Sequence, residues 1–424
     1  MCSLSEKVGL AVRWFSLAAL LCFFCFFHSS LPASEERFAL ATLSYSMAAP
    51  DPLEQSDASS AIWLEKSLKT ALAEGKNSEA QSQLHSLLKQ SQINPDILLK
   101  AGIDFAQKGL YDDAALAFGR CAQEHPKIFE AHYDLALAEF GLRHYARAFS
   151  VLRSAQARSR EEQLRLFYLR GKIENALGQS READRDLTAA FSADPSNENY
   201  ALDLGLYDLE HNAYPEAAKV FAQARIFHPH SAFAGLGLAL GQYLSGRIPS
   251  CILICHKLLS EHPTFVPART LLAFALYMHG SFREAEAVAK EGLTYPGRHP
   301  YLNYIDVAIL LKLQSQDYKR MLAEIDTAER QIPACSLCYL AQSKIDEARG
   351  ATRSAVEDLK EAVRLDPVFA DAWYRLAALY DQTGQHEKSA QARARFTALK
   401  AAKSEQESDM LRSAFMRALA QGEP

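Results

Sequence analysis

Two cysteines have the spacing that most directly suggests chemistry in this chain. Cys335 and Cys338 are separated by two residues, a spacing found in redox and metal sites, and they stand where a helix is expected to begin. Three interpretations stay open: a local disulfide, plain helix packing, and a redox pair whose thiolate the helix dipole stabilises. Tyr339 follows where haem attachment would need histidine, and no strand-helix-strand pattern supports a thioredoxin-like site. Cys251 and Cys255 occupy expected core positions, so we interpret them as structural.

A glycine-rich string raises the question of phosphate binding. Gly235, Gly237 and Gly241 lie inside an expected helix with no strand before it, so helix packing explains them better than dinucleotide binding does. The Gly-Lys pairs of the chain lack the upstream glycine that a phosphate loop requires. The sequence therefore predicts no nucleotide site.

Histidines recur at His125, His228 and His262, each immediately before a proline. A metal site needs ligands that converge from one local cluster, so we interpret these histidines as turn residues. No two histidines bracket a glutamate at zinc-protease spacing. We expect no metal, no cofactor and no catalytic residues.

The overall charge favours protein partners over nucleic acid. The chain has 424 residues, of which 46 are Lys or Arg and 51 are Asp or Glu, giving a formal net charge of -5. A nucleic-acid binder normally shows a strongly basic face. We therefore expect a protein partner.

An internal repeat builds the elements that position these residues. One marker position recurs with steps of 34 residues, one step of 35 and one of 36: Ala80, Ala114, Ala148, Ala183, Ala217, Cys251, Ala285, Met321, Ala355 and Ser389. Most repeats have a proline twelve residues after the marker, a small residue twelve before it and a glycine five before it. Proline ends a helix, glycine closes one in the left-handed conformation, and small residues let two helices approach. Each repeat is therefore predicted to be helix, turn, helix.

This pattern resembles the tetratricopeptide repeat in its period, its small residues and its late proline. The resemblance covers about ten repeats, from Ala61 to roughly Lys403, and implies an all-α, right-handed superhelical solenoid. Larger residues replace small ones in the first and eighth repeats, where looser helix spacing is expected: Leu68, Ile309 and Met321.

The family resemblance also implies an interaction surface. In tetratricopeptide repeats the first helix of each repeat lines a concave groove that binds partner proteins. The lining positions fall here on mostly apolar and aromatic residues, namely Tyr133, Leu137, Phe140, Tyr168, Lys172, Leu206, Phe233, Leu240, Tyr243, Phe274, Tyr277 and Met278. Some relatives hold acidic tails with Lys, Arg and Asn, and only Lys172 and Asn175 approximate that set here. The alternative is that tight coiling buries the stripe against neighbouring first helices.

The N-terminal segment predicts export. Lys7 and Arg13 precede an apolar run over residues 14–27, whose length suits the core of a signal peptide better than a full membrane span. Acidic residues follow the run, which places the body outside the cytoplasmic membrane. The protein is expected to be periplasmic, or anchored in the cytoplasmic membrane and facing outward; signal cleavage and a signal anchor stay open.

The sequence therefore predicts four segments. They are a signal peptide or anchor at 1–28, a flexible tether at 29–60, the solenoid at 61–403, and a C-terminal capping helix and tail at 404–424. The capping helix is expected because apolar residues share one of its faces: Leu411, Phe415, Ala418 and Leu419.

We predict a non-enzymatic protein–protein interaction scaffold or assembly adaptor of the bacterial cell envelope. The repeats fill the body so completely that no separate catalytic domain fits, although a site on the repeats themselves stays conceivable. One alternative is a groove that holds a lipid or polysaccharide chain. Another is a redox module that uses Cys335 and Cys338.

Overall fold

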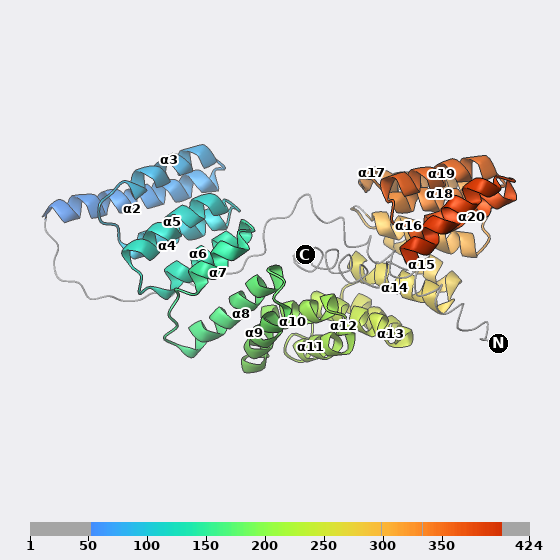
Figure 1. Ribbon diagram of the computed structural model, residues 1–424. Coiled ribbons are helices and arrows are strands. Elements are labelled where there is room, and N and C mark those ends of the chain that lie inside the picture. Colours follow the sequence, from blue (N-terminus) through green and yellow to red (C-terminus); the bar gives the residue numbers. More distant parts are fainter. Residues whose placement is uncertain (1–51, 298, 333, 401–424) are drawn as a thin grey trace. The chain divides into compact units, whose positions relative to one another are not determined.

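The structure is a computed structural model that describes residues 52–297, 299–332 and 334–400 (Figure 1). In this part of the chain the regular elements are α-helices, which come in antiparallel pairs of a first and a second helix. The pairs fall into an N-terminal unit, residues 52–204, and a C-terminal unit, residues 205–400, with the boundary inside α10 (Glu198–Glu210). The predicted all-α, helix-turn-helix architecture is confirmed over these residues.

The N-terminal unit holds four complete helix pairs. Its first helices are α2 (Pro52–Ala73), α4 (Pro95–Ala106), α6 (Phe129–Gly141) and α8 (Arg160–Ala176). Its second helices are α3 (Asn77–Leu88), α5 (Tyr111–Glu124), α7 (Tyr145–Leu152) and α9 (Ser180–Ala193). Helix α2 begins at Pro52, inside the segment 29–60 that was predicted to be a tether. Proline suits the first position of a helix, because the N–H that it lacks would have no partner within the helix there.

The C-terminal unit continues the same alternation. Its first helices after α10 are α12 (Ala232–Leu244), α14 (Val266–His279), α16 (Pro300–Lys312), α18 (Ser336–Ala348) and α20 (Ala370–Gln382). Its second helices are α11 (Tyr214–Phe227), α13 (Ile248–Glu261), α15 (Phe282–Gly292), α17 (Tyr318–Gln331) and α19 (Thr352–Leu365), and a further helix covers His386 to Lys400.

The turn inside each pair uses a left-handed residue, as the sequence predicted. Gly109, for example, has φ 72°, where a residue without Cβ avoids steric strain. Repeats without that glycine place Arg143, Asn212 and Gln314 in the same conformation, with φ between 56° and 61°. The step of 36 residues arises just after Gln314, where the turn before α17 is longer.

Small residues in the first helices face large ones in the second helices. A Cβ atom added to Gly102 would lie 2.4 Å from the ring of Phe118, and one added to Gly205 would lie 2.5 Å from Phe221. Both rings are fully buried, so each ring fills the space that its glycine leaves. The packing of Gly237 against Phe221 likewise confirms that the glycine-rich string serves helix packing.

The array is irregular at α7, whereas the positions with larger residues pack in the core. Helix α7 has only eight residues and is followed by an extended turn that ends in a capping box between Ser159 and Glu162. Leu68, Ile309 and Met321, where looser spacing was expected, are all fully buried, so the core accommodates their larger side chains.

Several predicted segments lie outside the described residues: the signal region, most of the tether and the capping helix with Leu411, Phe415, Ala418 and Leu419. Within residues 52–400, leaving aside 298 and 333, no helix has both the length and the apolar character needed to cross a membrane.

Candidate functional site

The N-terminal unit presents a row of apolar side chains on its first helices. Four apolar residues of this row are partly exposed and also pack on the core: Leu99 and Ile103 of α4, and Leu137 and Phe140 of α6. The row continues on α8 with Lys172, which is also partly exposed. Ile103 and Leu137 occupy the same position of successive repeats, as do Leu137 and Lys172. We call these five residues the first-helix strip.

A hydrogen-bonded group of three residues lies at the α8 end of the first-helix strip. The Lys172 ammonium lies 3.1 Å from a carboxylate oxygen of Asp203 in α10 and 3.3 Å from the hydroxyl of Tyr168. The Tyr168 hydroxyl donates a hydrogen bond to the same Asp203 oxygen. Lys172 also lies over the rings of Phe140 and Tyr168, 5.8 and 5.0 Å from their centroids. The group therefore joins α6, α8 and α10 of the N-terminal unit.

Tyr133, another predicted groove residue, is buried beneath a cation. The guanidinium of Arg165 lies 4.3 Å from its ring centroid and 3.9 Å from a carboxylate oxygen of Glu130. A cation over an aromatic face is stabilising, more so when partly desolvated. Tyr133 belongs to the buried cluster on which Leu137 and Phe140 of the first-helix strip pack.

Most of the predicted groove residues of the C-terminal unit are buried. Leu206, Leu240, Tyr243 and Phe274 expose less than a tenth of their surface, and the rings of Tyr243 and Phe274 lie 5.5 Å apart. For these four residues, burial agrees with the packing alternative. Their role in binding stays a prediction.

Phe233, Tyr277 and Met278 are partly exposed in the C-terminal unit. Burial raises the pKa of the Tyr277 hydroxyl to about 12, although the nearby Arg375 lowers it somewhat. Tyr277 is therefore a neutral hydrogen-bonding group at physiological pH.

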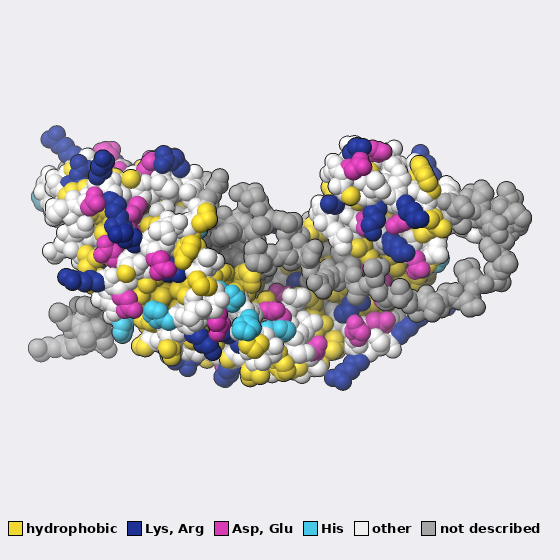
Figure 2. All heavy atoms as spheres, turned by 180° about the vertical axis from the view of Figure 1, so that it is seen from behind, with side chains coloured by type: hydrophobic (Ala, Val, Ile, Leu, Met, Phe, Trp, Pro, Cys, Tyr) yellow, Lys and Arg dark blue, Asp and Glu magenta, His cyan; other side chains and the backbone are white. Residues whose placement is uncertain are grey.

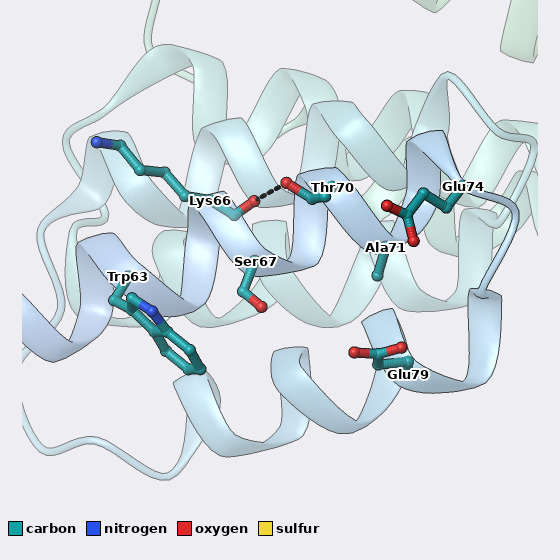
Figure 3. Close-up of a pocket in the computed structure, with 7 residues that line it drawn as sticks. All are labelled: Trp63, Lys66, Ser67, Thr70, Ala71, Glu74 and Glu79. Carbon is teal, nitrogen blue, oxygen red and sulfur yellow. Dashed lines mark hydrogen bonds between the residues drawn. The ribbon is translucent and has the colours of Figure 1, made fainter.

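A shallow pocket of about 300 Å³ lies between α2 and α3, and the sequence analysis missed it (Figure 3). Its wall is one face of α2, with the exposed Trp63 at one end and Glu74 near the other, and Glu79 faces it from α3. The recurrence of polar residues every three or four positions after Trp63 was the available signal. The lining mixes one indole with scattered polar groups and shows no nucleophile paired with a base.

Cys335 and Cys338 form a disulfide at the start of α18. Both are buried, and the Cys335 sulfur accepts a hydrogen bond from the backbone N–H of Cys338. Thiol exchange needs access of an attacking thiolate to a sulfur atom, so this burial favours a structural bond. Cys251 and Cys255 are buried thiols with their sulfurs 4.0 Å apart, and they lie in the core as expected.

The histidines of the inter-repeat turns bond to backbone. The His125 ring contacts the carbonyl of Ile93 and the His262 ring that of His230, each in the preceding turn. In the described part of the chain, no three His, Cys, Asp or Glu side chains gather in a way that could hold a metal.

A buried acidic pair in the C-terminal unit was also missed by the sequence analysis. Glu324 of α17 lies beside Asp306 of α16, and Arg320 bonds to both. Burial and the neighbouring Asp306 raise the pKa of Glu324 to about 8, and burial also raises the pKa of Asp306. The sequence held no signal for this pair, because the two acids are brought together only when α16 packs on α17.

Hydrophobic atoms reach the surface in patches among charged side chains (Figure 2). Consecutive helix pairs that pack on their neighbours define the class of α-helical repeat proteins.

Models of the tetratricopeptide repeat match residues 99–162, 168–232 and 359–391. The chain therefore contains tetratricopeptide repeats over these residues. Members of this family are generally non-catalytic and typically bind protein partners, which supports a protein–protein interaction scaffold.

The chain is similar to several solved structures at low identity. A tetratricopeptide repeat protein from Parabacteroides merdae is 18% identical, with 59% of this chain and 98% of that chain covered and a TM-score of 0.46. MamA from Desulfovibrio magneticus RS-1 is 17% identical; the match covers 41% of this chain and 97% of the MamA chain, with a TM-score of 0.36. YrrB, described as having an unusual peptide-binding site, is 15% identical; the match covers 46% of this chain and 99% of the YrrB chain, with a TM-score of 0.34. No curated protein sequence matches the chain.

Proposed function

We propose that this protein is a non-enzymatic assembly adaptor of the bacterial cell envelope that binds an apolar segment of a partner protein on the first-helix strip. The observation that supports this most is the partial exposure of four apolar residues on α4 and α6, namely Leu99, Ile103, Leu137 and Phe140, of which Ile103 and Leu137 occupy the same repeat position. Covering apolar surface that is still in contact with water stabilises a complex by about 25 cal/mol per Å².

The spacing of the strip suits a helical or extended partner segment. An amphipathic helix offers apolar side chains every three or four residues, and an extended segment offers them at alternate residues. The aromatic ring of Phe140, supported from below by buried neighbours, is the type of anchor that such interfaces use.

The envelope location is supported by two features of different kinds. Lys7, Arg13 and the apolar run over 14–27 have the pattern of an export signal. The disulfide between Cys335 and Cys338 is of a type that persists in oxidising compartments and is rare in the cytosol.

Burial decides which groove residues suit a binding test. Tyr243 and Phe274 are buried, so charges placed there would disrupt the fold and leave loss of binding ambiguous. Leu137 is partly exposed and is a better position. Leu116 on α5 is 48% exposed and gives a matched control on a second helix.

A photoreactive amino acid at position 137 should crosslink one protein partner in intact cells, and the same residue at position 116 should not. Leu137→Glu should reduce capture of that partner at least about tenfold, because a charge at the centre of an apolar contact costs more than 1.4 kcal/mol, whereas Leu116→Glu should leave it unchanged. Equal crosslinking at both positions would remove the strip as the binding surface. A fixed small-molecule mass on the purified protein in native mass spectrometry would instead support a lipid or polysaccharide carrier.

A further inference from the structure

Three cations on the first helices of the N-terminal unit pair with acids of a neighbouring repeat. Lys69 of α2 lies 3.8 Å from Asp104 of α4, and Arg165 of α8 lies 3.9 Å from Glu130 of α6. Lys172 of α8 lies 3.1 Å from Asp203 of α10. Each pair joins a cation on one first helix to an acid on the neighbouring first helix, so these three cations already have an acid beside them.

The pair between Lys172 and Asp203 lies where a partner would meet it. The Lys172 side chain is 22% exposed and that of Asp203 is 25% exposed, so the pair is partly desolvated yet reachable. Asp203 accepts bonds from both Lys172 and Tyr168, and the rings of Tyr168 and Phe140 flank the ammonium. An incoming carboxylate would have to compete with an acid that is already held by two donors.

We propose that Asp203 sets the specificity of the first-helix strip by neutralising Lys172, so that the strip selects apolar partner segments with no carboxylate at this point. This inference rests on the proposed function, because it assumes that the strip binds a peptide segment. The occupant is thus an uncharged, apolar segment of a partner protein.

Two contributions to the binding free energy favour an apolar segment over an acidic one. The exposed apolar side chains gain free energy when they are covered, whereas a carboxylate placed beside Asp203 would lose hydration and meet a like charge. The attraction of Lys172 does not offset this unfavourable free energy, because the Lys172 ammonium is already paired with Asp203 at 3.1 Å. Converting Asp203 to an amide removes the competing charge and leaves oxygen and nitrogen atoms in place for hydrogen bonding.

A displayed library of random twelve-residue peptides tests the inference on the whole protein. Peptides are counted as strip-bound only if Leu137→Glu abolishes their capture. The wild-type protein should select apolar peptides depleted in Asp and Glu. The Asp203→Asn protein should select acid-containing peptides, and these should bind it about five- to tenfold more tightly than they bind wild type.

Two further variants control for charge and for folding. Asp184→Asn changes the net charge equally at an exposed position of α9 and should leave the selected peptides unchanged. Lys172→Met combined with Asp203→Asn should lose the gained preference for acids, because the cation that attracts them is gone. Circular dichroism melts of each variant check that the helices persist.

The outcomes separate the two proposals. Acid-rich peptides captured by wild type through the strip, or no change of preference in Asp203→Asn, would overturn the role of Asp203 while strip binding itself stands. A library that yields no peptide dependent on Leu137 would overturn strip binding and, with it, this inference.

Discussion

The contact between Gly102 and Phe118 allows a test of how closely the paired helices pack. A Cβ atom at position 102 would lie 2.4, 2.6 and 2.7 Å from three carbon atoms of the Phe118 ring. The ring is fully buried, so it cannot move into solvent to make room. Gly102→Ala therefore forces α4 and α5 apart or moves the ring from its favoured rotamer.

The magnitude follows from two opposing terms. Replacing glycine by alanine inside a helix normally stabilises by about 1 kcal/mol, whereas forcing an extra carbon into a packed core costs about 1–3 kcal/mol. We expect Gly102→Ala to destabilise the N-terminal unit by about 0–2 kcal/mol, the difference between these two terms. Phe118→Leu in the same chain should recover much of this loss, because the smaller side chain gives room for the new methyl group.

Gly119→Ala is the control. It lies on α5, next to Phe118 in sequence, and a Cβ there would approach Leu135 no closer than 3.9 Å, an ordinary contact. This change should stabilise by about 0.5–1 kcal/mol.

Urea unfolding combined with hydrogen exchange of the α4 and α5 amides is the suitable assay, because repeat arrays unfold locally and not always in one step. The reasoning fails if Gly102→Ala matches or exceeds Gly119→Ala in stability. It also fails if Phe118→Leu gives the same loss with alanine at position 102 as with glycine.

Further predictions concern the C-terminal unit. The raised pKa of Glu324, about 8 against an ordinary 4.5, means that the folded state holds this proton more tightly than the unfolded chain does. The stabilisation that the protonated Glu324 gives the folded state is therefore complete below pH 4.5 and is lost as pH rises through about 8. Glu324→Gln should flatten the dependence of the melting temperature on pH. Asp326→Asn changes an exposed acid on the same helix and should leave that dependence as it is. Cys335→Ser with Cys338→Ser should lose about 2 kcal/mol, the chain-entropy value for so short a loop. Wild type that is reduced with dithiothreitol while unfolded in urea and then refolded should melt at a lower temperature than oxidised wild type, whereas the same treatment should not change the variant. Equal melting temperatures of reduced and oxidised wild type would show that the disulfide adds no stability.

Much of the fold could be predicted because it depends on local rules that repeat. The glycines that stand five residues before most markers predicted the left-handed turns, and Gly109 and its counterparts adopt them. The prediction of helix packing for Gly237 was likewise correct: this glycine of α12 packs on Phe221 of α11, the helix just before it in the chain. Helix α7 was harder, since no proline or glycine in the sequence marks its early end at Leu152.

The candidate site was only partly predictable. Positions carried over from the family located Leu137, Phe140 and Lys172 on the first helices, where the structure has them. The same reasoning could not separate these partly exposed residues from Tyr243 and Phe274, which are buried. Exposure of a first helix depends on how closely its neighbours approach, and that distance is set by packing between repeats.

The sequence by itself determined the repeat, the helix pairs, the turn conformations and the apolar character of the first helices, because each of these follows from residues less than one repeat apart. Tertiary structure decided which of those apolar residues reach solvent, and it paired Lys172 with Asp203 and Asp306 with Glu324. Those contacts depend on side chains from different helices meeting at distances of a few ångströms, and a periodic pattern along the chain holds no information at that scale.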